Sequence, residues 1–158
     1  MLRVEPIDDM ELVRLTMTVP HIWDATSDDG YIKPSEFNPK QTPGIYWIGV
    51  WDDDKYLGLF LIETVNVWCC DSHVAMLPWC GGRRAIKAHE LTKQWIWTNT
   101  TFRRIITATP SCNKLGLKFA RMAGFVKFGL NPKSWLKNGE LHDLVLSGVD
   151  LWADNGAH

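Results

Sequence analysis

The sequence lacks the features that mark several large classes of protein. No apolar run approaches the roughly 20 residues that a membrane-spanning helix needs. Lys and Arg number 17 and Asp and Glu number 18, so no basic field points to a nucleic-acid partner. The first twelve residues contain no signal-peptide core, and we therefore expect a cytoplasmic location without membrane attachment. No internal repeat or low-complexity tract is present.

Cysteine is scarce and its spacing excludes the common cysteine-built sites. The chain has four cysteines, and Cys69 and Cys70 are adjacent, so their side chains would point to opposite faces of a strand. No CxxC pair and no matching histidine spacing is present, so we expect no metal site. Reduced thiols are the preferred interpretation.

The chain has the size and composition of a single globular domain. Its 158 residues are 46% hydrophobic and 22% charged, which is ordinary for a soluble domain with its own core. We expect one domain over residues 1–150 and a C-terminal tail over residues 151–158.

Hydrophobic periodicity and turn residues predict seven strands and four helices. The expected strands are 2–7, 45–51, 56–65, 67–77, 102–109, 125–130 and 141–146. The expected helices are 8–18, a short one within 19–29, 81–98, and one between Ser111 and Gly124. Residues 28–44 contain Gly30 and three prolines and are expected to form a long loop. The order β-α-α-β-β-β-α-β-α-β-β predicts an α/β fold with a mixed, mainly antiparallel sheet flanked by helices.

The segment FRRIITATPSCNKLGLKFARMAGF, residues 102–125, carries the strongest pattern. A β-branched strand is broken at Pro110, and an amphipathic helix follows. Leu115, Phe119, Met122 and Ala123 have the spacing of one helical face. Gly124 then supplies a left-handed C-cap before the next strand.

This segment resembles the C-terminal half of the GNAT N-acetyltransferases. In that family a strand ends near an Asn, here Asn113, and a helix of about three turns closes on a Gly-Phe pair, here Gly124-Phe125. The resemblance extends along most of the chain and implies the GNAT fold and binding of acetyl-CoA. The chain departs from the family at Ala120, where the family usually has a Tyr that protonates the departing thiolate.

The candidate cofactor loop is Gly81-Gly82-Arg83-Arg84, between a strand and a helix. Free backbone N–H groups at a helix start favour phosphate, two glycines permit close approach, and two arginines pair with phosphate oxygens. The loop departs from the family motif, because Arg84 falls where the family has a small residue. The alternative interpretation is a tight turn whose arginines are solvated, and a Gly-rich loop alone does not decide between the two.

The resemblance also implies the other contacts of acetyl-CoA. Backbone N–H groups of Ala75, Met76 and Leu77, on the strand before the loop, would contact the thioester oxygen. Asn113 would meet the pantetheine arm or an ordered water near the sulfur.

For the base that deprotonates the acceptor amine we consider Glu63, Asp71 and His73 on the central hairpin, with His73 and Glu63 as the preferred pair. Histidine exchanges protons near neutral pH. The alternative is that His73 is a half-buried strand residue bonded to a neighbour and that Glu63 faces solvent.

Two functions from different classes follow. The first is a GNAT-like N-acetyltransferase that transfers acetyl from acetyl-CoA to an amine of unknown identity. The second is a catalytically inactive GNAT-fold scaffold that binds a protein partner or assembles into a virion, since the chain is also similar to GNAT-like proteins of tailed bacteriophages. Under that alternative the protein would reside in the host cytoplasm or the virion, and a homodimer is compatible with either.

Overall fold

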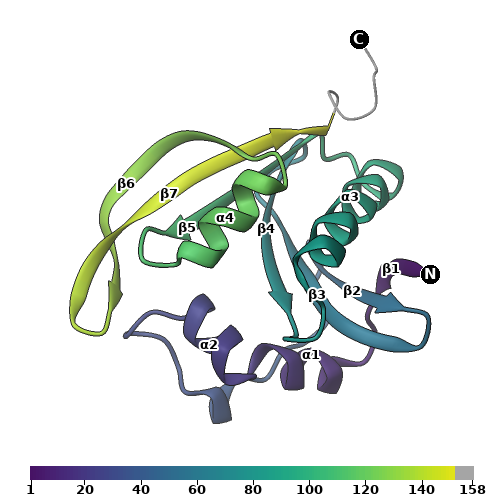
Figure 1. The fold of residues 1–158 in the computed structure, drawn as a ribbon, viewed down its shortest axis with the longest axis horizontal. Helices are drawn as coiled ribbons and strands as arrows, with labels where there is room; N and C mark the ends of the chain where they lie inside the picture. The colour runs from purple at the N-terminus through teal and green to yellow at the C-terminus, as the bar shows by residue number, and fades with distance from the viewer. Residues whose placement is uncertain (152–158) are drawn as a thin grey trace.

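The computed structural model describes residues 1–151 and contains one mixed sheet of seven strands, in the order β1-β2-β3-β4-β5-β7-β6 (Figure 1). Neighbouring strands are antiparallel except β4 and β5, which run parallel near the middle of the sheet. The strands are β1 (Leu2–Pro6), β2 (Ile45–Asp52), β3 (Lys55–Thr64), β4 (Cys69–Met76), β5 (Arg104–Pro110), β6 (Val126–Lys137) and β7 (Glu140–Asp150).

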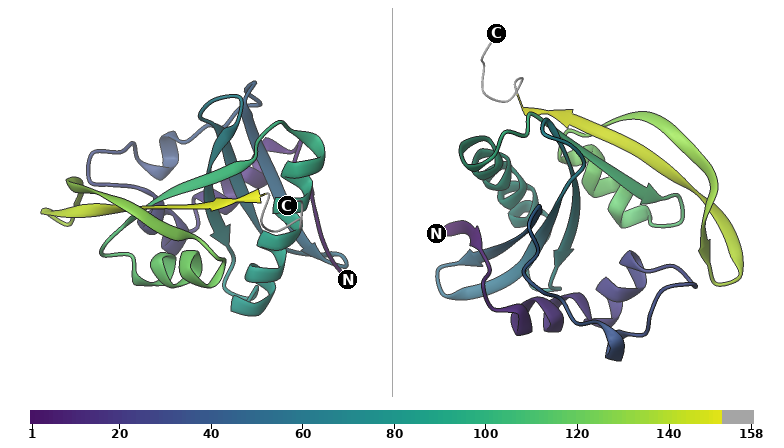
Figure 2. Two further views of the ribbon diagram at one scale, coloured as in Figure 1. Left: turned by 90° about the horizontal axis from the view of Figure 1, so that it is seen from above. Right: turned by 180° about the vertical axis from the view of Figure 1, so that it is seen from behind.

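Helices cover both faces of the sheet and create a core on each. The helices are α1 (Met10–Met17), α2 (Pro20–Thr26), α3 (Gly82–Asn99) and α4 (Lys114–Met122). α3 and α4 lie on one face, and α1 and α2 lie on the other (Figure 2). Leu59 and Phe60 are consecutive on β3 and both fully buried, one in each core, because successive strand side chains point to opposite faces.

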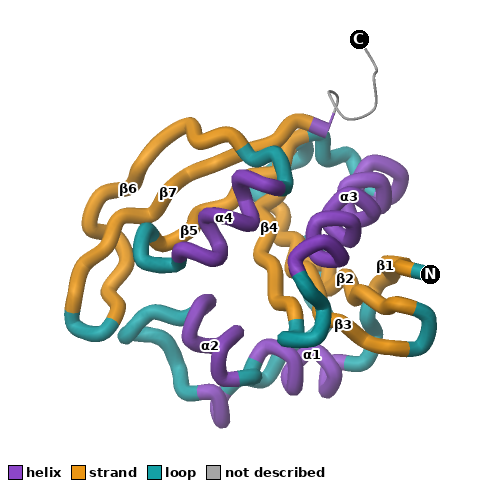
Figure 3. The backbone as a smooth tube through the Cα atoms, viewed as in Figure 1, coloured by secondary structure: helices purple, strands orange, loops and turns teal. Residues whose placement is uncertain are grey.

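Local sequence accounts for the two N-terminal helices. The Asp9 carboxylate caps α1 by accepting from the N–H groups of Glu11 and Leu12 at 3.0 and 3.3 Å, which satisfies donors that the helix itself leaves unpaired. Pro20 begins α2 at the position where a missing N–H costs nothing. The residues after α2 run to β2 as a long loop with one short 3₁₀ turn, Pro34–Glu36 (Figure 3).

The predicted fold class and element order are confirmed, but the last two strands are longer than expected. β6 and β7 have 12 and 11 residues, and the strand continues through Asn131-Pro132, which the sequence suggested was a connection. Proline is tolerated here because β6 is an edge strand and the pairing shifts register between Asn131 and Trp135. Asn138 and Gly139, both with positive φ, form the hairpin turn.

The predicted apolar face of α4 is wrong in part. Leu115 and Met122 are 81% and 59% exposed, although their spacing matched that of Phe119 and Ala123. The buried side is centred on Ala120 and Ala123, so the helix is rotated relative to the expectation.

The structure also bears on the predictions for the cysteines, for membrane-spanning helices and for the C-terminal tail. The four cysteines are free thiols, and Cys69 is less buried than Cys70, as opposite strand faces require. No helix in residues 1–151 is long and apolar enough to cross a membrane. Of the predicted tail 151–158, only Leu151 lies within the described residues, and it is buried.

The turn of the β6–β7 hairpin is bonded to the end of α2, about 110 residues away in the chain. The Lys137 ammonium donates to the carbonyl oxygens of Asp24 and Ser27 at 2.6 and 2.8 Å and lies 3.1 Å from the Asp24 carboxylate. A cation at the C-terminal end of a helix also meets the negative end of the helix dipole.

The second half of this connection is made by Asp29. Its carboxylate accepts from the N–H groups of Asn138 and Gly139, each at 2.9 Å, and its own N–H donates to the Leu136 carbonyl. The bonds from Gly139 and Asn138, with the nearby charge of Lys137, lower the pKa of the Asp29 carboxyl. We call the contacts between residues 24–29 and residues 136–139 the hairpin clasp.

The hairpin clasp predicts a defined acid sensitivity. Because the pKa of Asp29 is lower in the folded than in the unfolded state, its carboxylate stabilises the fold above the unfolded pKa. That contribution is lost as the pH falls through the folded pKa. We expect Asp29→Ala to lower the melting temperature at neutral pH, with the difference from wild type shrinking toward about pH 2.

Thermal unfolding followed by circular dichroism across this pH range measures the effect. The exposed turn residue Asp54 provides the control, and Asp54→Ala should follow the wild-type curve. A constant difference between Asp29→Ala and wild type at every pH would contradict the assignment.

Candidate active site

The candidate site begins where β4 and β5 separate. The two strands pair only over Cys69–Asp71 and Arg104–Ile106. Beyond these residues β4 stays paired with β3 as far as Met76, and β5 stays paired with β7 as far as Pro110. The sheet is therefore open between the C-terminal halves of two neighbouring strands.

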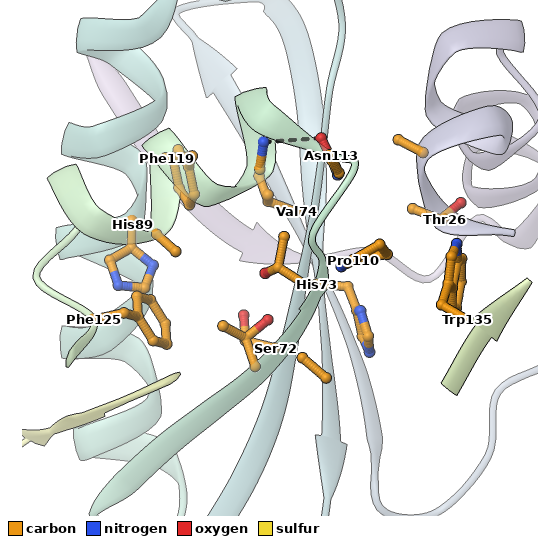
Figure 4. A pocket seen from close by; sticks show the side chains of 16 residues that line it. Thr26, Ser72, His73, Val74, His89, Pro110, Asn113, Phe119, Phe125 and Trp135 are labelled. Carbon is orange, nitrogen blue, oxygen red and sulfur yellow. Dashed lines mark hydrogen bonds between the residues drawn. The ribbon is translucent and has the colours of Figure 1, made fainter. Parts of the chain in front are cut away.

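A cavity of about 160 Å³ occupies this opening and reaches both faces of the sheet (Figure 4). On one side it is lined by His89 of α3 together with Phe119 and Phe125. On the other side it is lined by Ala25 and Thr26 of α2 and by Trp135 of β6. The remaining lining residues come from the strands and from α4: Ser72, His73, Val74, Thr107, Ala108, Thr109, Pro110, Asn113, Gly116 and Ala120. Two molecules entering from opposite faces would meet inside it.

The unpaired side of β4 presents backbone N–H groups to this opening. Leu77 donates its N–H to Leu57 of the β3 side at 2.8 Å, so the alternation of an antiparallel pair directs the Ala75 N–H to β3 as well. The N–H groups of Val74 and Met76 point the other way, toward β5. The prediction that Ala75 and Leu77 present N–H donors to the opening is therefore wrong. The N–H groups of Met76 and Val74 lie on the open side, and the contact of Met76 with a thioester oxygen stays a prediction.

The carbonyl of Met76 fixes this end of β4 to the N-terminal helices. It accepts a hydrogen bond from Nε2 of His21, at the start of α2, at 3.2 Å. Because the N–H and C=O of one strand residue point to the same side, this bond marks the side of Met76 that faces away from β3.

The three candidate bases lie together on the face covered by α1 and α2. Glu63 on β3 is directly opposite Asp71 on β4, and His73 follows two residues later on the same face. Nε2 of His73 lies 3.6 Å from the Glu63 carboxylate and 3.8 Å from that of Asp71. His73 also lines the cavity, so the group connects the cavity to a pair of carboxylates.

The pKa of the Asp71 carboxyl is raised. Burial is the main cause that raises its pKa, and the charge of Glu63 raises it further. The charge of His73 and the N–H of Ser72 act in the opposite direction. A second negative charge beside Asp71 is therefore unfavourable, and a cation between the carboxylates is favoured.

Asn113 lies at the cavity wall and caps α4. Its Oδ1 accepts from the Gly116 N–H at 2.9 Å, so the amide NH₂ group is the donor that this bond leaves unused. A Cβ on Gly116 would come within 2.6 Å of that amide nitrogen, so glycine is needed for this cap. The predicted contact of Asn113 with a cofactor stays a prediction, now placed at the cavity.

The N-terminus of α3 has the features of an anion site. Gly81 is the N-cap, its φ is +77°, and it provides no side-chain cap. The first helical hydrogen bond is the one from the Ala85 N–H to the Gly81 carbonyl, so the N–H groups of Gly82 and the next two residues precede it. A Cβ added to Gly82 meets no atom within 4 Å, which leaves open space for a ligand.

The two arginines of this loop differ. Arg83 is exposed. Arg84 donates to the carbonyl oxygens of Cys80 and Trp79, each at 2.7 Å, and pairs with the Asp52 carboxylate at 3.2 Å. Arg84 therefore holds the loop in place, and its predicted contact with phosphate stays a prediction.

A second cavity of about 500 Å³ adjoins the first and shares Ala25, Pro110, Asn113 and Trp135 with it. Its other lining residues are mostly polar or charged: Asp24, Cys112, Lys114, Leu115, Lys137, Asn138, Glu140 and His142. Within residues 1–151 no group of three or more His, Cys, Asp or Glu side chains is arranged to hold a metal ion.

Val74, His89 and Trp135 also line the cavity, and the sequence pattern did not predict them. Val74 could not be predicted without knowing which N–H groups of β4 are bonded to β3. His89 packs with its ring centroid 5.3 Å from that of Phe125 and 6.0 Å from that of Phe119, and its place in an apolar helix stripe gave no signal. Trp135 could not be predicted because it lies in the part of β6 beyond the predicted strand.

No protein-family model and no curated protein matches the sequence. Solved structures do match, over nearly the whole chain. Spermidine N-acetyltransferase from Vibrio cholerae, in complex with CoA and spermine, has a TM-score of 0.79 at 16% identity and covers 95% of each chain. The ribosomal-protein-S18-alanine N-acetyltransferase of Escherichia coli has a TM-score of 0.69 at 8% identity, covering 96% of this chain and 94% of its own.

A GNAT-family acetyltransferase from Streptococcus pneumoniae also has a TM-score of 0.69, at 14% identity, covering 95% of this chain and 99% of its own. At these identities the likeness shows the fold alone. The chain therefore has the fold of the GNAT N-acetyltransferases, as its sequence pattern implied.

The cluster of Glu63, Asp71 and His73 predicts opposite changes of the Asp71 pKa in two variants. Glu63→Gln removes a negative charge and should lower the pKa of Asp71, whereas His73→Gln removes the charge that protonated His73 places beside Asp71 and should raise it. Titration of the Asp71 carboxyl carbon by ¹³C NMR measures both changes against wild type. Equal pKa values in all three proteins would show that the groups do not interact.

Proposed function

We propose that this protein is an N-acetyltransferase that moves the acetyl group of acetyl-CoA to an amine. The observation that carries the proposal is the cavity that crosses the sheet between β4 and β5. α3, which follows β4 in the chain and contributes His89 to the cavity wall, has an open N-terminus. His73, with two carboxylates beside it, also lines the cavity. The solved structures with the same fold include N-acetyltransferases, one of them in complex with CoA.

The residues of the first α3 turn fit the diphosphate of acetyl-CoA. Three N–H donors at the start of an 18-residue helix attract an anion, and Gly82 leaves room for phosphate oxygens beside the backbone. Exposed Arg83 adds a cation that is able to pair with phosphate. Acetyl-CoA, when bound, supplies a thioester carbonyl carbon as the electrophile.

The open edge of β4 stabilises the charge that develops on the thioester oxygen. The N–H groups of Val74 and Met76 point into the space between the strands, and donors fixed in a folded backbone need no reorganisation during the reaction. Asn113 offers its amide NH₂ group at the opposite wall.

His73 removes the proton from the acceptor amine. The amine nitrogen forms a bond to the acetyl carbon while the carbon–sulfur bond breaks, so the electron pair of that bond leaves with the thiolate. The amine proton passes to His73, and Glu63 and Asp71 stabilise the resulting imidazolium at 3.6 and 3.8 Å. Ala120 has no acidic group, so the thiolate takes its proton from water.

A second candidate function is a protein-binding scaffold, favoured by exposed apolar side chains away from the cavity. Val67 and Trp68 in the β3–β4 turn are 70% and 57% exposed, and Phe128 on edge strand β6 is 55% exposed. Exposed aromatic residues are frequent anchors of protein interfaces. This function requires no acetyl-CoA, and binding of acetyl-CoA therefore distinguishes the two.

The proposal predicts that Gly82→Glu abolishes acetyl-CoA binding. The new carboxylate would occupy the open space at the α3 N-terminus and repel phosphate. Gly82 is the right position because Gly81 has a left-handed φ, so a substitution there would also strain the backbone. Calorimetric titration with acetyl-CoA measures the loss.

Gln94→Glu provides the matched control, since it adds the same charge to an exposed position later in α3. It should bind acetyl-CoA like wild type. Equal affinity of Gly82→Glu and wild type would exclude this helix end as the phosphate site.

The proposal also predicts that His73→Gln lowers kcat/KM for the amine by about 10²–10⁴-fold, the usual contribution of a positioned base. Affinity for acetyl-CoA should not change. The defect should shrink at high pH, where more of the amine is already deprotonated. Thiol release at saturating acetyl-CoA measures the rate.

Glu63→Gln removes one of the carboxylates that stabilise the imidazolium of His73 and should also lower kcat/KM. Glu5→Gln is its control, because Glu5 is an exposed strand carboxylate outside the cavity. It should leave kcat/KM close to the wild-type value. If His73→Gln and wild type have the same pH–rate profile, His73 is not the base.

A further inference from the structure

The hairpin clasp flanks the amine end of the cavity on both sides. Lys137 is two residues from Trp135 on β6, so both side chains point to the same face of the strand. The carbonyl oxygens that Lys137 bonds belong to Asp24 and Ser27, and these two residues immediately precede and follow Ala25-Thr26. Trp135 and Ala25-Thr26 line the same side of the cavity at this end, and Figure 4 shows Trp135 next to Thr26 with His73 across from them.

The hairpin clasp holds residues 24–29 and residues 136–139 together through several charged contacts. The side chain of Lys137 is only 15% exposed, and its ammonium has three oxygen partners within 3.1 Å. Hydrogen bonds of a buried cation are about twice as strong as neutral ones. Asp29 adds two further charge-assisted bonds to the hairpin turn. The position of Trp135 relative to Ala25-Thr26 is therefore set by contacts outside the 160 Å³ cavity, along the wall of the second one.

The space that this wall encloses is narrow. A cavity of about 160 Å³ is close in size to an engineered protein cavity of about 150 Å³ that holds one benzene molecule. It must receive the reacting amine together with the acetyl group. The methyl of Ala25, the side chain of Thr26 and the indole of Trp135 offer mainly apolar contacts to the carbon next to the nitrogen.

We propose that the hairpin clasp sets the width of the amine end and thereby limits the acceptor to primary amines on an unbranched carbon chain. This inference rests on the proposed acetyltransferase function. An unbranched chain passes between this wall and the residues Pro110 and Asn113, which border both cavities, into the adjoining cavity of about 500 Å³. There Asp24, Lys137 and Glu140 offer charged contacts to a polar far end. A methyl branch next to the nitrogen meets the wall.

The first test compares two isomeric amines, butylamine and sec-butylamine, as acceptors. We expect wild type to prefer butylamine by at least about tenfold in kcat/KM, the usual effect of one misplaced methyl group in a fitted pocket. Lys137→Met keeps the apolar stem of the side chain and removes the bonds of the clasp, so the preference should largely disappear.

Lys127→Met is the matched control, because Lys127 is an exposed lysine on the same strand and outside both cavities. It should keep the wild-type preference. Asp29→Ala weakens the clasp from its other half and should also reduce the preference, which keeps the test valid if Lys137→Met does not fold. Equal use of both amines by wild type, or an unchanged preference in a folded clasp variant, would overturn the inference.

A binding measurement separates this inference from the proposed function. If neither amine is acetylated, the function fails, but the width of the cavity is still measured by NMR. The indole Nε1–H signal of Trp135, identified with Trp135→Phe, should shift on addition of butylammonium and not of sec-butylammonium. Equal shifts with both ions, or no shift with either, would overturn the inference.

Discussion

The separation of β4 from β5 is the constraint on which the rest of the structure depends. Three paired positions join the strands at one end, while β3 and β7 hold their outer edges along nearly their full lengths. A sheet that opens in this way leaves backbone donors of β4 unpaired and leaves a space that no side chain fills completely. Buried backbone groups need partners, so such an opening is costly unless a ligand or water supplies them.

The surrounding elements give this opening two different entrances. α3 and α4 present aromatic side chains and an open helix N-terminus on one face. α2 and the β6–β7 hairpin present a narrow, mainly apolar wall on the other, beside His73 and its carboxylates. This arrangement suits a reaction between two molecules that arrive from opposite sides, with the transferred group in the middle.

The element order was predictable because each signal for it is local. Asp9 and Pro20 begin helices, and Gly124 ends one, through contacts within a few residues. β6 was predicted too short because Asn131-Pro132 has the composition of a turn, and only its position on a sheet edge makes a strand acceptable there.

The parts of the site that depend on pairing across the chain were not predictable. The N–H groups of Ala75 and Leu77 seemed as available as that of Met76 until the register with β3 was known. Arg84 gave no sign that it would bond its own loop. The hairpin clasp joins residues about 110 positions apart, and nothing near Lys137 in the sequence indicates its partners.

Acetyl transfer within the cavity is the central claim to be tested. The most direct measurement incubates the purified protein with acetyl-CoA carrying a ¹³C-labelled acetyl group and with butylamine, and follows N-acetylbutylamine by mass spectrometry. We expect labelled product to accumulate in equal amount with free CoA thiol, and to be lost in His73→Gln. Release of thiol without acetylated amine, or no turnover in a protein that binds acetyl-CoA tightly, would contradict the account.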